Sequence, residues 1–213
     1  MNKPEYVVNK RFDFRKKYHS ALSDSYLNAF IVGLIFVCSL TYSALKINWS
    51  ISTFLVIPLA FIYGETVFYL AHRFQQHKKV RFSEWAFEMH TFWHHGMFSN
   101  ENMGLESPKD MNMVILPFFI YIFVLGFLYL PIGYFLDLYF STDIGWVVLF
   151  AITLHFIWYE IVHTLSHLEN PPILKKLAKH HRDHHDPRIM GQYNFGIGTT
   201  LLDRIFGTVY SGK

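Results

Sequence analysis

The chain has 213 residues, of which 52% are hydrophobic and 19% aromatic, and this apolar content exceeds that of an ordinary soluble domain. The length fits one domain over residues 1–213, and no internal repeat or long linker divides it. The formal net charge of +3 requires no nucleic-acid partner, because the basic residues flank the apolar stretches, where anionic lipid headgroups would lie.

Four apolar stretches follow one another along the chain, at about residues 26–47, 51–71, 113–136 and 144–168. Each is long enough to cross a hydrocarbon core ~30 Å thick at a rise of about 1.5 Å per residue. Helices of soluble bundles rarely stay uncharged over such lengths. The pattern therefore predicts an all-α fold, an integral membrane bundle of four transmembrane helices.

The basic residues predict the orientation of this bundle. Of 19 Lys and Arg, six precede the first stretch, five lie between the second and third, and seven follow the fourth, which leaves Lys46 alone on the other side. The positive-inside rule then puts both termini and the central loop in the cytoplasm. No cleavable signal peptide is visible, so we expect a multi-pass protein of a bacterial inner membrane rather than of the endoplasmic reticulum.

Thirteen histidines are present, and eleven of them form four tight groups. These groups are His72 and His77; His90, His94 and His95; His163 and His167; and His180, His181, His184 and His185. The predicted topology puts all four groups at the cytoplasmic side, in a His-rich helical cap made of segments 72–112 and 163–210. Only His19 and His155 stand apart; we interpret His19 as a surface residue and His155 as a hydrogen-bond partner between helices.

The later groups have spacings that suit metal binding. Residues three or four apart share one face of a helix. His163 and His167 can therefore point at one ion, and His181, His184 and His185 can present three nitrogens to one side.

The earlier groups suggest a second ion. His90 and His94 share a face, whereas His95 is turned about 100° further and could reach another ion. His72 and His77 are five apart, which is awkward for an ideal helix, so we expect the helix to end or bend between them.

The kind of metal is limited by the ligands. Imidazole suits iron, zinc, copper and nickel, and ten or eleven imidazoles exceed what one ion can use, so two ions are the natural number. Spacing does not separate zinc from iron. The only cysteine, Cys38, lies in the first apolar stretch, which excludes a thiolate site.

The pattern of the four histidine groups resembles that of the fatty acid hydroxylase superfamily, which includes sterol desaturases and sterol methyl oxidases. Its histidine boxes, of the forms H-x3-4-H and H-x2-3-H-H, are matched by the four groups above. Residues 194–208, which contain Asn-Phe-Gly and Asp-Arg-Ile-Phe-Gly-Thr, resemble the closing signature of that family. The resemblance covers about residues 63–210. His180 is an extra imidazole beside the last box, and either His180 or His181 could be the ligand there; we favour His181.

The resemblance implies a non-haem centre of two iron ions (Fe2+/Fe3+), dioxygen as co-substrate and a lipid-like substrate. Its implied metal ligands are His72, His77, His90, His94, His95, His163, His167, His181, His184 and His185. We expect an O2-dependent oxidoreductase that hydroxylates a C–H bond of a fatty acyl chain, a sterol or another lipid. A desaturase or methyl oxidase of the same family is the alternative. No haem-binding His-Pro-Gly-Gly occurs, so we expect electrons from a separate b-type cytochrome, or from a ferredoxin with its reductase.

Two further residues are candidates for catalysis. Glu160 lies three residues before His163, where its carboxylate could accept the second N–H of an imidazole ligand and fix its tautomer. Glu65 could do the same for His72, or it could simply reach water at the interface. Asn194 is a candidate polar contact at the site, and equally a turn residue. The aromatic stretch 82–98 could lie in the membrane interface or line the entry path of the substrate.

Two rival functions predict other patterns. A membrane metal transporter or sensor would place ionisable residues through the depth of its spans, whereas these histidines gather at one end. A haem cytochrome would need histidines on two spans at matching depth, and only His155 and His163 are embedded. Substrate, regiochemistry, hydroxylation as opposed to desaturation, electron donor and oligomeric state are not fixed by the sequence.

Overall fold

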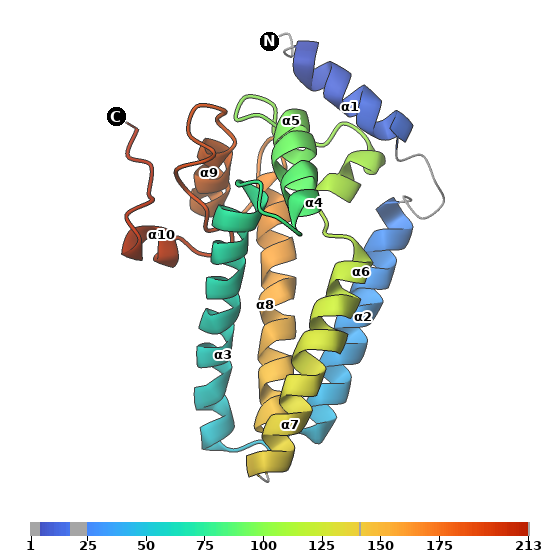
Figure 1. Ribbon diagram of the computed structural model, residues 1–213, viewed down its shortest axis with the longest axis vertical. Coiled ribbons are helices and arrows are strands. Elements are labelled where there is room, and N and C mark those ends of the chain that lie inside the picture. The colour runs from blue at the N-terminus through green and yellow to red at the C-terminus, as the bar shows by residue number, and fades with distance from the viewer. Residues whose placement is uncertain (1–4, 18–24, 141, 213) are drawn as a thin grey trace.

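A computed structural model describes residues 5–17, 25–140 and 142–212, and the regular elements within these ranges are all helical (Figure 1). Four helical segments are long and apolar enough to cross a membrane: Ser25–Lys46, Ile51–Gln76, Pro108–Tyr139 and Ile144–Ser166. The predicted all-α fold with four long apolar helices is confirmed. The second segment extends five residues beyond the predicted stretch, and the third begins five residues earlier, because helical turns of the histidine-bearing cap continue both of them.

The central helix of the bundle is α8 (Ile144–Ser166), which packs against α2 (Ser25–Lys46), α3 (Ile51–Leu70) and α7 (Leu130–Phe140). In its most apolar window 56% of the residues are buried, against 22–24% in the other three segments. The outer faces of those three expose large apolar side chains, as helices that contact lipid do.

A close approach joins α3 to α8. A Cβ atom on Gly64 would lie 2.9 Å from Cγ of His155, so only glycine lets the His155 ring pack there. One helical turn after Gly64, the Phe68 ring contacts the rings of His155 and Tyr159 at centroid distances of 5.2 and 4.6 Å. This packing brings the histidine-bearing ends of α3 and α8 side by side.

The third segment is composite. It begins with the 3-10 turn η4 (Pro108–Met113) and continues through α6 (Phe118–Tyr121), the π-helix η5 (Ile122–Tyr129) and α7. Asn28 of α2 holds its entry, because the Phe118 backbone N–H donates to Asn28 Oδ1 at 2.8 Å and Asn28 Nδ2 donates to the Leu116 carbonyl at 3.3 Å. These bonds satisfy backbone groups that hydrocarbon could not.

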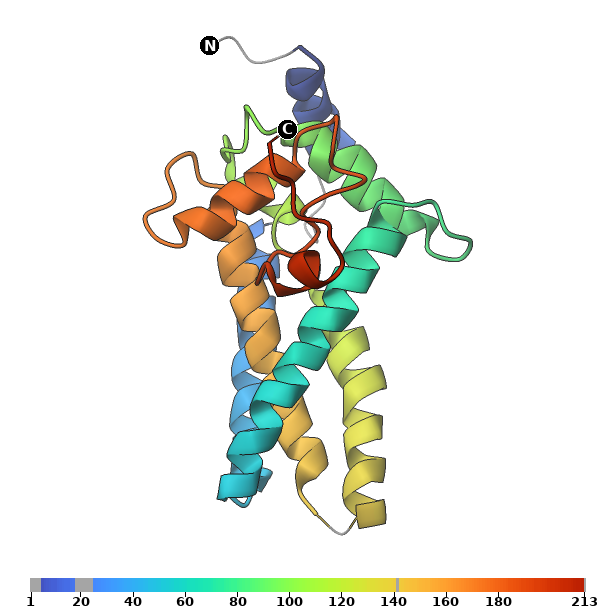
Figure 2. The ribbon, with the colours of Figure 1, turned by 90° about the vertical axis from the view of Figure 1, so that its left-hand side faces the viewer.

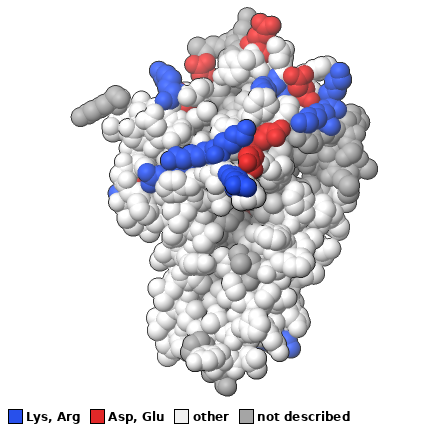
Figure 3. All heavy atoms as spheres, in the orientation of Figure 1, with Lys and Arg blue, Asp and Glu red and all other residues white. Residues whose placement is uncertain are grey.

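The remaining helices form a cap at one end of the bundle (Figures 1 and 2). They are α1 (Glu5–Lys17), η2 (Ala71–Gln76), α4 (Glu84–Phe87), η3 (Glu88–His94), α5 (His95–Met97), α9 (Lys175–His184) and α10 (Leu201–Ile205). Charged side chains gather on this cap in the face shown, and the bundle below it is almost free of charge (Figure 3). The arrangement is that of a multi-pass membrane protein with its polar mass at one end.

Candidate dimetal centre

The cap brings nine histidines together in two groups, and the ring nitrogens of each group lie within 4.8 Å of one another. The first group consists of His72, His77, His90, His95 and His184. The second group consists of His94, His167, His181 and His185. Residues up to 113 positions apart in the chain thus meet at one place, because the end of α8 and the cap elements η2, η3, α5 and α9 converge there.

Short contacts between Nε2 atoms define the first group. His72 Nε2 lies 2.8 Å from His90 Nε2, and His77 Nε2 lies 2.9 Å from His184 Nε2. His95 Nε2 is 3.1 Å from His90 Nε2. Five imidazoles therefore present the same ring atom to a common centre.

The helix that carries His72 ends at Gln76, as expected, but its last turn is the π-helix η2. A π-turn closes its hydrogen bonds five residues apart, so it brings residues i and i+5 onto one side. His72 and His77 have that spacing, and an α-helical turn would have separated them. The widened turn is a local feature that the histidine spacing itself requires.

The same geometry corrects the prediction for the central histidines. His90 and His95 share the first group, whereas His94 belongs to the second; the sequence had paired His90 with His94. The cause is the π-helix η3, which brings residues five apart together in place of residues four apart. The later box is also divided, since His184 joins the first group and His181 and His185 the second.

The second group has longer contacts between its Nε2 atoms. His181 Nε2 lies 3.2 Å from His167 Nε2 and 3.1 Å from His185 Nε2, and His94 Nε2 is 3.2 Å from His185 Nε2. His163 stands beside it, with its ring centre 4.9 Å from those of His167 and His181. The Nε2 atom of His163 is buried without a hydrogen-bond partner, so it is free to face an ion.

Two loops hold the Nδ1 atoms of six of these rings through backbone carbonyls. The central loop, residues 98–114, supplies four of them: Phe98 to His185 at 2.7 Å, Met103 to His167 at 3.3 Å, Met113 to His94 at 2.6 Å and Val114 to His163 at 2.8 Å. The C-terminal loop, residues 193–196, supplies two: Tyr193 to His184 at 2.8 Å and Phe195 to His72 at 2.5 Å. A carbonyl only accepts, so each Nδ1 carries the proton and each Nε2 keeps its lone pair.

This donor set fits a pair of metal ions. Lone pairs that face one another at about 3 Å repel unless a cation lies between them, and a carbonyl on the other ring nitrogen is the usual support of a ligating histidine. Burial lowers the pKa of His90, His167 and His184 well below 6.5, and the neighbouring imidazoles lower it further, so the rings are neutral as ligands must be. The all-nitrogen set suits iron, zinc, copper or nickel.

The two candidates for catalysis have other partners in the structure. Glu160 Oε1 accepts hydrogen bonds from the Tyr121 hydroxyl and, at 2.9 Å, from the Leu116 backbone N–H, in place of the predicted imidazole. The reason is that α6 and its entry lie against that face of α8. Asn194 adopts a left-handed conformation with φ of 59°, and its side chain bonds the His180 carbonyl and the Tyr210 N–H. It is a turn residue; the catalytic roles of both residues remain predictions.

The extra histidine of the last box faces away from the centre. His180 Nε2 lies 2.8 Å from Asp203 Oδ2, whereas His181 is fully buried among the imidazoles of the second group. The geometry therefore favours His181 over His180, as the sequence interpretation did. His19 lies outside the described residues.

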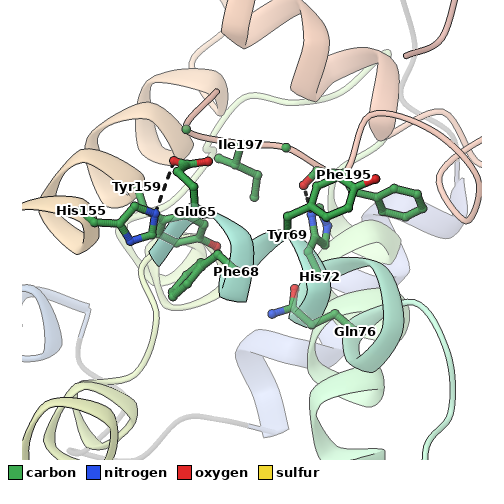
Figure 4. Close-up of a pocket in the computed structure, with 11 residues that line it drawn as sticks. Glu65, Phe68, Tyr69, His72, Gln76, His155, Tyr159, Phe195 and Ile197 are labelled. Atoms are coloured by element: carbon green, nitrogen blue, oxygen red, sulfur yellow. Dashed lines mark hydrogen bonds and ion pairs between the residues drawn. The ribbon is translucent and has the colours of Figure 1, made fainter. Parts of the chain in front are cut away.

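A small pocket lies on the bundle side of His72, between α3, α8 and the C-terminal segment (Figure 4). His155 Nε2 of α8 lies 3.3 Å from Glu65 Oε1 of α3, but the contact lacks hydrogen-bond geometry, so the predicted hydrogen-bond role of His155 stays a prediction. Glu65 accepts from the Thr199 hydroxyl at 3.4 Å. The predicted pairing of Glu65 with His72 is absent among the described contacts, since the Phe195 carbonyl occupies Nδ1 of that ring.

Three buried charged residues in the cap were missed by sequence reasoning. Arg11 and Asp110 are 1% and 0% exposed and meet beside the central loop, and Asp203 is 0% exposed beneath the C-terminal loop. Asp203 belongs to the Asp-Arg-Ile-Phe-Gly-Thr run, which was a usable signal. Arg11 is one of several basic residues near the N-terminus, and nothing in the sequence distinguishes it.

Four apolar helices that carry two buried clusters of imidazoles at one end define a membrane protein with a dimetal centre. The sequence pattern of the fatty acid hydroxylase family matches residues 57–208, well over half of the chain. The chain therefore belongs to the fatty acid hydroxylase family.

Among solved structures, one described as "Full length scs7p (only hydroxylase domain visible)" matches with a TM-score of 0.58 and 20% sequence identity. The alignment covers 85% of this chain and 63% of that one, so this chain spans less than two thirds of its length. At that identity the likeness concerns the fold. No curated protein matches the chain.

Proposed function

We propose that this chain is a non-haem di-iron hydroxylase that inserts one oxygen atom of dioxygen into a C–H bond of a lipid-like substrate. The second oxygen atom leaves as water, which requires two protons and two electrons for each turnover. The electrons come from a separate electron-transfer protein, either a b-type cytochrome or a ferredoxin with its reductase. A fatty acyl chain or a sterol is the substrate class that fits a site reached from a membrane.

The observation that carries this proposal is an apolar pocket of about 80 Å³ that reaches histidines of both groups. His90 of the first group, His94 of the second and the adjacent His163 all line it. Its lining also includes Trp85 and Met89. A metal transporter would need a polar path at this place, whereas an apolar pocket suits a hydrocarbon chain.

The pocket is also lined by residues 114–117, the segment that leads into α6. Trp85 and Phe119 flank this region with a ring-centre distance of 5.9 Å, and both are about half exposed, at 47% and 49%. The pocket thus lies where the cap meets the bundle, and a lipid tail would enter it sideways from the bilayer. This placement supports the entry-path interpretation of the aromatic stretch 82–98.

Iron ions, when bound, supply the redox chemistry that reduces dioxygen and oxidises an unactivated C–H bond, which zinc cannot do because it does not change oxidation state. The residues of the chain do the rest. Neutral imidazoles, six of them oriented by backbone carbonyls on Nδ1, would hold the ions with Nε2. The apolar walls of the pocket position one carbon of the tail beside them and exclude bulk water.

The excess of Lys and Arg at the cap supports a cytoplasmic location for the site, because cytoplasmic segments of membrane proteins are enriched in these residues. We place the protein in a bacterial inner membrane. Accessibility of Lys175, which is exposed on α9, to a membrane-impermeant amine reagent would test the side: labelling only after the cells are opened is expected. Labelling in intact cells would refute the cytoplasmic location.

The function is tested by comparing the lipids of cells that produce the wild type, His163→Ala, His184→Ala or Lys179→Ala. Lys179 lies on the exposed face of α9 and serves as the control. Both histidine variants are expected to lose a lipid that has gained one oxygen atom, and Lys179→Ala to retain it. Loss of a species that lacks two hydrogens would identify a desaturase instead. Unchanged lipids in variants that have lost their iron would refute lipid oxidation.

A further inference from the structure

We propose that each half of the dimetal centre is held by its own loop and that one buried charged residue locks each loop, Arg11 for the central loop and Asp203 for the C-terminal loop. Arg11 and Asp203 are then positioning residues that act on different ions. The inference rests on the proposed dimetal site, since it concerns how its two halves are supported. It assigns to the helix α1 a role in metal binding, although α1 carries none of the described histidines.

Each loop supports the histidines of one half of the dimetal centre only. Each carbonyl that the central loop gives to an imidazole goes to the second group or to the adjacent His163. The two carbonyls of the C-terminal loop go only to the first group. A shift of one loop would therefore turn the rings of one half-site and leave the other half-site in place.

The Arg11 side chain holds the central loop and the residue before it through backbone carbonyls. Its Nε atom donates to the Met97 carbonyl at 2.9 Å, one terminal nitrogen donates to Gly104 at 3.0 Å and the other to Asn102 at 3.2 Å. Three carbonyls spread over eight residues are thus gathered by one planar guanidinium, which a lysine ammonium could not span. Met103, whose carbonyl supports His167, lies between two of these anchor points.

The buried carboxylate of Asp110 pairs with Arg11 and also binds the central loop. Asp110 lies 3.4 Å from Arg11 and accepts two hydrogen bonds of 2.8 Å from Arg15, the next basic residue on the same face of α1. It also accepts the backbone N–H groups of Glu106 and Ser107 at 3.0 and 3.1 Å. A buried guanidinium and a buried carboxylate are costly unless each is fully paired, so the pairing ties α1 firmly to the loop.

Asp203 fixes the C-terminal loop in the same manner with the opposite charge. Its carboxylate accepts the backbone N–H groups of Phe195 at 2.9 Å and Gly196 at 2.7 Å. It also accepts the Thr208 hydroxyl at 2.7 Å and faces His180 Nε2 at 2.8 Å. Phe195 therefore links Asp203 to the site: its backbone N–H donates to Asp203, and its carbonyl accepts from His72 Nδ1.

The test measures iron bound to the purified full chain. Wild type, Arg11→Met and Asp203→Asn are loaded anaerobically with ferrous iron, passed through gel filtration, and analysed for iron per chain. About two ions are expected for the wild type and about one for each variant, because a displaced supporting carbonyl weakens a metal site 10–100-fold. Lys16→Met on the exposed face of α1 and Arg204→Met beside Asp203 are the matched controls and should keep about two.

Double variants identify which ion is lost. His181→Ala removes a ring of the second group and His184→Ala a ring of the first. Arg11→Met combined with His181→Ala should hold as much iron as His181→Ala alone, whereas Arg11→Met combined with His184→Ala should hold almost none. Asp203→Asn should show the reverse dependence. A general loss of stability would lower iron equally in both combinations.

Several results would overturn the inference. Retention of two ions by Arg11→Met, or equal loss in the two double variants, would show that α1 does not act on one half-site. If Arg11→Met does not yield folded protein, Arg11→Lys keeps the charge beside Asp110 but cannot span the three carbonyls, and it must show the same selectivity. Fewer than two ions in the wild type would refute the dimetal site itself, and that outcome is visible before any variant is compared.

Discussion

The Nε2 atoms of His77 and His184 lie 2.9 Å apart although 107 residues separate them in the chain. His77 lies at the end of η2, and it is less buried than the other histidines of the first group. His77→Ala should therefore remove one ion and reduce lipid oxidation at least about 100-fold, because a lost ligand costs more than a lost supporting contact. Iron analysis and product formation measure both effects. Lys78→Ala, an exposed neighbour, should behave as the wild type.

Glu160 offers a test of a role assigned from spacing alone. Its carboxylate bonds Tyr121 and the Leu116 N–H, and no hydrogen bond from it to a histidine occurs within residues 25–140 and 142–212. Glu160→Ala should keep two ions per chain while lowering stability by about 1–3 kcal/mol, since buried donors lose their acceptor. Thermal unfolding and iron analysis of the same sample measure this. If Glu160→Ala lost iron without a fall in the unfolding temperature, the result would instead support the predicted role of Glu160 as a partner of an imidazole ligand.

The pocket that reaches both histidine groups can be blocked without touching them. Met89 lines it from η3, so Met89→Trp should fill the space and reduce lipid oxidation at least about tenfold while both ions stay bound. Leu45→Trp, at a side chain that is 78% exposed near the end of α2 away from the cap, is the control. Full activity of Met89→Trp would show that the lipid reaches the site by another path.

Acid should destabilise the metal-free protein. Burial lowers the pKa of His185 to about 3 and those of His94, His95 and His181 well below their usual 6.5. The unfolded chain then binds more protons than the folded chain below pH 6.5, so the free energy of unfolding falls as the pH falls, by up to about 1.4 kcal/mol per pH unit for each ring.

The thermal midpoint of the metal-free protein should accordingly decrease between pH 7.5 and pH 5. Protons also compete with the metal for the same Nε2 atoms, so bound iron should dissociate over the same range. A midpoint that is constant or rises on acidification would mean that the rings are not held neutral in the fold.

The contact of Gly64 with His155 predicts sensitivity of the bundle to one methyl group. Gly64→Ala puts a Cβ 2.9 Å from Cγ of His155 and 3.1 Å from Ile152 Cδ1, so α3 and α8 must separate, at a cost of about 1–3 kcal/mol. At Gly33 of α2 no atom lies within 4 Å of the added carbon, and Gly33→Ala should be neutral or slightly stabilising. Thermal unfolding in detergent distinguishes the two. Equal midpoints would refute the close approach.

The sequence predicted the four apolar helices and the meeting of the histidine groups because both follow from composition and from the distribution of charge. It did not predict which group each histidine joins. That assignment depends on the π-turns η2 and η3, where the number of residues per turn changes, so that His90 and His94 join different groups although their ring centres lie 5.0 Å apart.

The supports of the site were harder still to predict. The atoms that orient the rings are backbone carbonyls, and a carbonyl carries no signature of residue type. Arg11 is recognisable only when α1 is seen against the central loop. Glu160 was assigned to His163 by its spacing, but its carboxylate accepts a hydrogen bond from Tyr121 of another helix. Asp203 alone had a recognisable sequence context.

The π-turn η2 also makes the site depend on chain length more than on side-chain identity. Phe74 and Gln75 within it are exposed, so their replacement has little to disturb. Deletion of either residue would leave the two histidines four apart, and a helix that returned to 3.6 residues per turn would still place them on one face. Insertion of a residue would instead put them six apart, about 120° away around an α-helix, and the ion would be lost. Homologous enzymes should therefore carry these two histidines either five apart on a widened turn or four apart on an α-helical one, and a longer spacing would mark a relative that has lost its metal.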